Sequence, residues 1–91
     1  MNNEVYTPVK EIKVKAHHDK KNTYYIVGYG YMDWDRKGTN IKPAIYVMME
    51  YNGVRNPHLV AHMVTEKNED GTSDFENVMA AIDELRQEYG I

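Results

Sequence analysis

The chain has 91 residues, 42% of them hydrophobic and 27% charged, which excludes a disordered or fibrous protein. This length makes one domain, residues 1–91, with no room for a two-domain enzyme that has a cleft between its halves. The absence of cysteine excludes a disulfide framework, a thiolate nucleophile and a cysteine-ligated zinc site.

The net charge of −3 is unevenly distributed along the chain. Residues 1–45 carry eight bases and five acids (+3), whereas residues 46–91 carry three bases and nine acids (−6). Such a division indicates either a basic contact surface on an acidic body or two solvated faces. Residues 1–15 contain no apolar segment typical of a secretory signal, and no stretch approaches the ~20 apolar residues of a membrane span. We therefore expect a cytoplasmic protein with no membrane association.

The apolar residues favour strands, because nine Val, six Ile and eight Tyr stand against two Leu. Residues 1–8 are expected to form a loosely held N-terminal lead-in. The alternation over residues 9–17 predicts a half-buried edge strand, and its lysines discourage edge-to-edge association. After a polar turn, the β-branched and aromatic residues 23–33 predict a second strand.

A loop over residues 34–40 leads to residues 41–51. This segment is apolar on both faces after Pro43, which predicts an interior strand whose start lies near the rim of the sheet. Asn52-Gly53 is the strongest hairpin signal in the chain. Residues 58–66 predict the fourth strand.

The most distinctive element is a C-terminal helix that begins at Ser73. Ser73 and Glu76 have the spacing of a capping box, and Gly90 ends the pattern. The apolar residues at helical spacing are Phe75, Val78, Met79, Ile82, Leu85 and Tyr89.

These elements predict an α+β fold: a four-stranded antiparallel meander sheet with one C-terminal helix packed on one face (β-β-β-β-α). The helix is ~10–12 Å wide, whereas four strands at about 4.8 Å spacing make a sheet roughly 19 Å wide. One helix can therefore cover one face of the sheet and leaves the other face to a different partner.

Strand periodicity divides the side chains between the two faces. The side predicted to face the helix comprises Ile12, Val14, Ala16, Ile26, Gly28, Gly30, Ile45, Val47, Met49, Leu59, Ala61 and Met63. The opposite side comprises Lys13, Lys15, Tyr25, Val27, Tyr29, Tyr31, Lys42, Tyr46, Met48, Glu50, His58, Val60, His62, Val64 and Glu66. On this assignment the two glycines allow the helix to approach closely, and the opposite side forms an aromatic patch of the kind that marks an interaction site.

No cluster of residues points to catalysis or to a metal, so neither an enzyme nor a cofactor is expected. His58 and His62 are about 13 Å apart on a strand and cannot ligate one ion. The loop that begins at Asp33 starts like a calcium-binding loop, but Lys37 and Ala44 occupy two ligand positions. The single serine, Ser73, is explained as a helix cap.

We therefore predict a small non-enzymatic binding protein that acts by occupying or sequestering a partner. A homodimer through the sheet face not covered by the helix is the expected assembly, and a partner protein can use the same face. Single-stranded nucleic acid stacked on tyrosines beside lysines is an alternative, as is a nucleotide or other small molecule in a tyrosine-lined pocket. The predicted binding residues are Tyr25, Tyr29, Tyr31, Trp34, Arg36, Lys42, Tyr46, Met48 and His62.

Compact, cysteine-free, tyrosine-rich and acidic chains of this size resemble accessory or inhibitor proteins of bacteriophages and other mobile elements. The resemblance is one of type and rests on no specific motif. It implies that the acidic half of the chain, for example Glu69, Asp70 and Glu84, either imitates nucleic-acid phosphates towards a basic target or forms a solvated surface.

Overall fold

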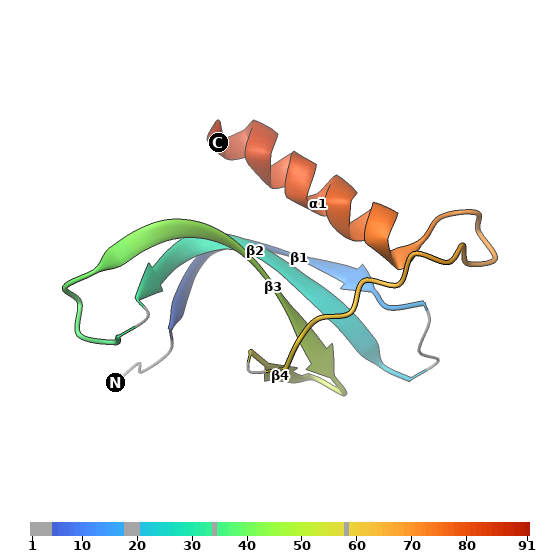
Figure 1. Cartoon of the computed structure of the whole chain (residues 1–91), viewed down its shortest axis with the longest axis horizontal. Helices are drawn as coiled ribbons and strands as arrows, with labels where there is room; N and C mark the ends of the chain where they lie inside the picture. The colour runs from blue at the N-terminus through green and yellow to red at the C-terminus, as the bar shows by residue number, and fades with distance from the viewer. Residues whose placement is uncertain (1–4, 18–20, 34, 58) are drawn as a thin grey trace.

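The computed structural model describes residues 5–17, 21–33, 35–57 and 59–91. Its elements are β1 (Tyr6–Lys15), β2 (Thr23–Asp33), β3 (Ile41–Tyr51), β4 (Val54–Asn56) and α1 (Asp74–Tyr89). The strands form one antiparallel sheet in the order β1-β2-β3-β4, and α1 packs on one face, against β1 and β2 (Figure 1). The predicted meander with a C-terminal helix is confirmed.

The bounds of the strands differ from the prediction at both ends of the sheet. β1 begins at Tyr6, so residues 6–8 belong to a strand and not to a lead-in. Asn52 (φ 51°) and Gly53 (φ 83°) form the predicted hairpin turn, with the positive φ angles of a type I′ turn. β4 follows directly and ends at Asn56, before Pro57. The fourth strand was therefore predicted in the wrong place, since residues 59–66 have no strand structure.

The start and end of α1 are as predicted. Ser73 Oγ accepts a hydrogen bond from the Glu76 amide at 3.0 Å, and Glu76 Oε1 accepts one from the Ser73 amide at 3.1 Å. Gly90 closes the helix in the left-handed conformation, with φ 66°. Val78 and Leu85 lie at the centre of the buried stripe. The residues of the predicted stripe that stay substantially exposed are Phe75 and Met79.

The core lies between α1 and the sheet, and it corrects the predicted phase of β2. Tyr25 and Val27 are fully buried beneath the helix, and Tyr29 packs against the same cluster. Ile26 belongs to a second cluster on the opposite face, together with Tyr46. The prediction for β2 was wrong by one residue, because both of its faces are apolar and the alternation gives no contrast. The predicted phases of β1 and β3 were correct.

A buried polar cluster fixes the start of α1 to the sheet. The carboxylate of Asp74, which is fully buried, accepts hydrogen bonds from the His17 amide at 3.2 Å and from Asn68 Nδ2 at 3.0 Å. The Tyr25 hydroxyl lies 3.1 Å from Asp74 Oδ2 and 2.5 Å from the carbonyl oxygen of His62. This cluster connects β1, β2, the segment before the helix and α1 at one point.

The sheet has a partly open edge along β3. β4 pairs only with residues 49–51 of β3. The Asn52 amide donates a hydrogen bond to the Asn22 carbonyl of the neighbouring chain segment. In this register the backbone N–H and C=O groups of the even-numbered residues of β3 point towards β2. The odd-numbered positions, including Pro43, Ile45 and Val47, therefore face outward, and Pro43 has no N–H to offer there.

Candidate binding surfaces

The face of the sheet opposite α1, called the far face below, is covered by its own side chains. The Tyr46 ring stacks on Tyr6 with centroids 4.4 Å apart, and its hydroxyl donates to Glu11 at 2.8 Å. The ring lies over Gly28, where an added Cβ atom would be 2.3 Å from Tyr46 Cζ. Gly28 therefore makes room for a tyrosine on the far face and not, as predicted, for the helix.

An ion-pair network crosses the same face. Arg55 of β4 contacts Glu11 of β1 at 2.6 Å although two strands lie between them, which the strong curvature of the sheet allows (Figure 1). Glu50 is buried and bonds Lys13 at 2.8 Å and Arg55 at 3.5 Å. The hydrogen bond from Lys13 holds the pKa of Glu50 below its usual value, despite the opposing effect of burial. These charges satisfy one another within the chain.

The predicted binding residues divide among three places. Tyr25 and Tyr29 lie beneath α1, with Tyr29 stacked on Tyr89 at 4.5 Å, so their assignment to the far face was wrong. Tyr46 and Met48 do lie on the far face, but each is only 7% exposed. Both lie among their own neighbours and form no open platform.

His62 lies outside the strands of the sheet. His62 is exposed in the segment before α1, where its carbonyl accepts the hydrogen bond from Tyr25. Trp34 lies outside the described residues.

The remaining predicted residues, Tyr31, Arg36 and Lys42, lie together at the loop end of β2 and β3. We call residues 31–33 and 35–43 the hairpin end; in Figure 1 it bends away from α1. Tyr31 is 47% exposed and stands opposite Pro43, and Ile41 is 54% exposed. The sequence predicted the start of β3 near the rim of the sheet, but Ile41 and Pro43 were not among the predicted binding residues, because the prediction assigned them to an interior strand.

The loop of the hairpin end is held by its own acids. Asp33 Oδ2 accepts from the Gly38 amide at 3.0 Å, and Asp35 Oδ1 accepts from the Lys37 amide at 3.0 Å. This second hydrogen bond is the main reason that the pKa of Asp35 lies below its usual value. Arg36 stands at the turn in the left-handed region, with φ 59°.

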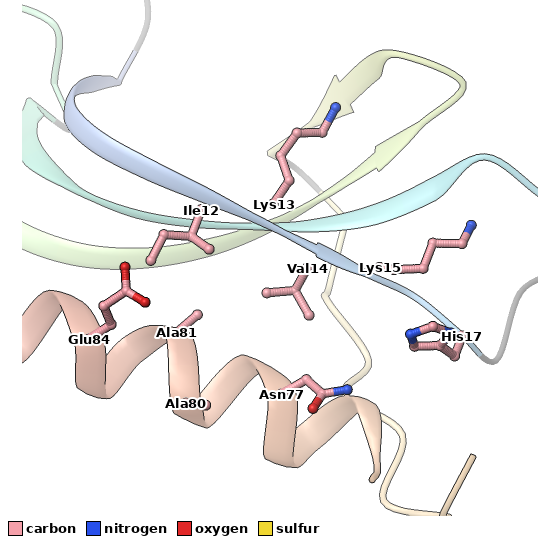
Figure 2. A pocket seen from close by; sticks show the side chains of 9 residues that line it. All are labelled: Ile12, Lys13, Val14, Lys15, His17, Asn77, Ala80, Ala81 and Glu84. Atoms are coloured by element: carbon pink, nitrogen blue, oxygen red, sulfur yellow. The ribbon is translucent and has the colours of Figure 1, made fainter. Parts of the chain in front are cut away.

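A second surface lies along β1, the outermost strand of the sheet. An open groove of about 360 Å³ runs between β1 and α1 (Figure 2). Ile12 and Val14 point into it from the strand, and Ala80 and Ala81 line it from the helix, while Lys13 points to the far face. The other residues that line it are Lys15, His17, Asn77 and Glu84. The sequence gives no direct signal for this groove, because it depends on where the helix crosses the sheet.

A metal-binding cluster and a membrane-spanning helix are both absent from the described residues. No group of three or more His, Asp or Glu side chains among them is placed to hold a metal ion. Within the same residues, no helix is long and apolar enough to cross a membrane. Comparisons with protein-family models, with curated proteins and with solved structures found no match for this chain.

Two tyrosines are expected to resist ionisation in the folded protein. Burial, followed by the charge of Asp74, raises the pKa of Tyr25, and burial, followed by the hydrogen bond to Glu11, raises that of Tyr46. The folded state then keeps protons that the unfolded state loses above the ordinary tyrosine pKa of about 10. Stability from these groups is complete below that pH and is lost as the pH rises above it.

Ultraviolet absorbance of tyrosinate, followed during an alkaline titration, measures this effect. We expect Tyr25 and Tyr46 to ionise only as the protein unfolds, and the Tyr46→Phe variant to lose one of these two delayed ionisations. Simultaneous ionisation of all eight tyrosines in a protein that remains folded would contradict the burial described here.

Proposed function

We propose that this chain is a small non-enzymatic binding protein that occupies a partner protein through its hairpin end. The carrying observation is the exposed apolar group formed by Tyr31, Ile41 and Pro43 where α1 no longer covers the sheet. Exposed apolar side chains gathered at one place are typical of protein interaction sites. A tyrosine supplies a rigid, amphipathic contact in such sites.

The charge beside this apolar group favours an acidic partner. Within the described residues, none of the ion pairs involves Arg36, Lys37 or Lys42. The neighbouring acids, Asp33 and Asp35, accept hydrogen bonds from the loop itself. The cations are therefore available at the rim, where they raise association rates and specificity towards a negatively charged surface.

The tyrosine rings favour a protein partner over single-stranded nucleic acid. Tyr46 is stacked on Tyr6, and Tyr29 on Tyr89. Tyr24 has the ammonium groups of Lys13 and Lys15 over its ring, at 4.6 and 5.1 Å. Bases need free ring faces for stacking, so these five rings do not support a tyrosine and lysine platform on the sheet.

A small molecule is also less well supported. The groove between β1 and α1 is lined by nine residues, and no tyrosine is among them. This groove is therefore not the tyrosine-lined pocket that binding of a nucleotide or other small molecule would use. A role in occupying a partner agrees with the accessory or inhibitor type of protein that the composition resembles.

The test is affinity capture followed by reconstitution with the purified partner. The double variant Tyr31→Ala/Ile41→Ser should weaken binding at least about tenfold, since truncated interface anchors commonly cost 1–2 kcal/mol each. Val60→Ser is the matched control, because Val60 is 75% exposed in the segment before α1 and should not affect binding. Equal affinity of the wild type and the double variant would refute the assignment of this surface.

A further inference from the structure

The free edge of β1 is the starting observation. The hydrogen bond from the Ala16 amide to the Thr23 carbonyl, at 3.1 Å, directs the even-numbered backbone groups of this part of β1 towards β2. The N–H and C=O groups of Glu11, Lys13 and Lys15 therefore point away from the sheet. Within the described residues, no other strand pairs with this edge.

We propose that this edge pairs antiparallel with β1 of a second copy of the chain, about a two-fold axis at Ile12. Backbone groups can be exchanged only between outward-facing positions, so odd-numbered residues must face odd-numbered residues across the axis. Every axis that lies on a residue meets this condition, and the axes at residues 11 to 14 lie in the regularly paired part of β1, after the register shift between Pro8 and Lys10. The lysines of β1, which are expected to discourage edge-to-edge association, stand opposite like charges in some of these registers and not in others.

Charge complementarity selects Ile12. With the axis there, Glu11 of each copy stands opposite Lys13 of the other, next to the contacts that Glu11 makes with Arg55 and Lys13 makes with Glu50 in its own chain. This register adds two neighbours of unlike charge to that network and brings no like charges opposite each other. An axis at Glu11 or at Lys13 sets that residue against its own counterpart, and an axis at Val14 sets Lys13 against Lys15 twice. Like charges directly opposite each other destabilise a strand pair, and unlike charges stabilise it.

The position of α1 fits the same arrangement. The helix packs on β1 and β2, so antiparallel pairing of the two β1 strands brings both α1 helices to the same side of one continuous sheet. The groove beside β1 leaves the flank of α1 that carries Ala80 open towards the second copy (Figure 2).

Small side chains permit two helices to approach each other closely. Ala80 is exposed on the flank of α1 that faces the groove, next to Ala81 (Figure 2). The two grooves then face each other across the axis and cover Ile12 and Val14 of both copies. A second copy in this register therefore covers the apolar lining of the groove, pairs the free backbone groups of β1 and places unlike charges opposite each other.

The absence of cysteine from the chain makes a sharp test possible. In the proposed register, residue 12 faces its own counterpart in a non-hydrogen-bonded pair with Cα atoms ~4.5 Å apart, which suits a disulfide. Residue 14 lies four residues from its counterpart, or about 13 Å. We therefore expect full-length Ile12→Cys to form a covalent dimer under mild oxidation, at least about tenfold faster than Val14→Cys or the exposed control Val60→Cys.

Two further measurements use the unmodified chain. Light scattering should show a dimer that dissociates on dilution. Amide exchange followed residue by residue should show protection of Glu11 and Lys13 that increases with concentration, while Ile12 and Val14 are protected throughout by β2. A strict monomer up to the solubility limit overturns the proposal. So does a dimer in which Val14→Cys cross-links faster than Ile12→Cys.

Discussion

Asp74→Ala is expected to lower the free energy of unfolding by about 3 kcal/mol, because it leaves buried donors without their acceptor. The carboxylate is fully buried and accepts from the His17 amide and from Asn68, with the Tyr25 hydroxyl 3.1 Å away. It also stands in the first turn of α1, where a negative charge interacts favourably with the helix dipole. Urea denaturation followed by circular dichroism measures the change.

Two matched variants separate this effect from a general loss of helix charge. Asp83→Ala removes an exposed acid of the same helix that pairs with Arg86, and it should change the free energy of unfolding by less than about 0.5 kcal/mol. Asp74→Asn keeps the shape and one acceptor oxygen, so it should cost about half as much as Asp74→Ala. A loss below about 1 kcal/mol for Asp74→Ala would mean that the cluster does not hold the helix to the sheet.

Gly30→Ala is the second variant with a large expected effect, a loss of about 3 kcal/mol, at the upper end for overpacking. An added Cβ atom at residue 30 would lie 2.2 Å from the carbonyl oxygen of Thr7 and 2.8 Å from Pro8 Cα. Both are backbone atoms of β1, beside the register shift between Pro8 and Lys10. The only relief is to separate the first part of β1 from β2.

Gly28→Ala provides the comparison for this variant. Its Cβ atom meets the far end of the Tyr46 side chain, which can rotate away at the expense of the Tyr6 stack and the Glu11 hydrogen bond. We expect a loss of about 1–2 kcal/mol, smaller than for Gly30→Ala. Thermal denaturation of the two variants in parallel shows which of them loses more stability. A larger loss for Gly28→Ala would contradict the close approach of the β1 backbone to Gly30.

The strand that carries both glycines, β2, shows what could be predicted from the sequence and what could not. The β-branched and aromatic composition of residues 23–33 predicted β2 with its correct ends. It did not predict which face meets the helix, because Tyr25 and Val27 are as apolar as Ile26. The choice between the faces depends on the pairing register with β1 and β3, which one strand cannot reveal.

The position of β4 was within reach of the sequence. A two-residue turn at Asn52-Gly53 requires the next strand to begin at Val54, which is where β4 begins. Pro57 then ends it after three residues. The alternation that follows places Ala61 and Met63 against the core without any strand pairing, whereas Leu59, predicted on the same side, is 52% exposed. The predicted burial pattern was therefore correct only in part, and the element was not a strand.

The binding surface was predictable only in part. Tyr31, Arg36 and Lys42 do lie together at the hairpin end, since a loop between paired strands brings both strand ends to one place. The sequence could not show that side chains of the same chain cover the far face. That covering depends on the curvature of the sheet, which brings Arg55 to Glu11. A flat four-stranded sheet would have left the same tyrosines open.

Pro43 limits how large an assembly of this chain can become. A protein with two pairing-competent edges can add copies at both ends without limit, and fibres form in that way. On β3 the outward position 43 has no N–H, and β4 already occupies residues 49–51, so only a short run around Ile45 and Val47 remains. Strand addition on that side is therefore weak, and in the proposed assembly growth through β1 closes at two copies.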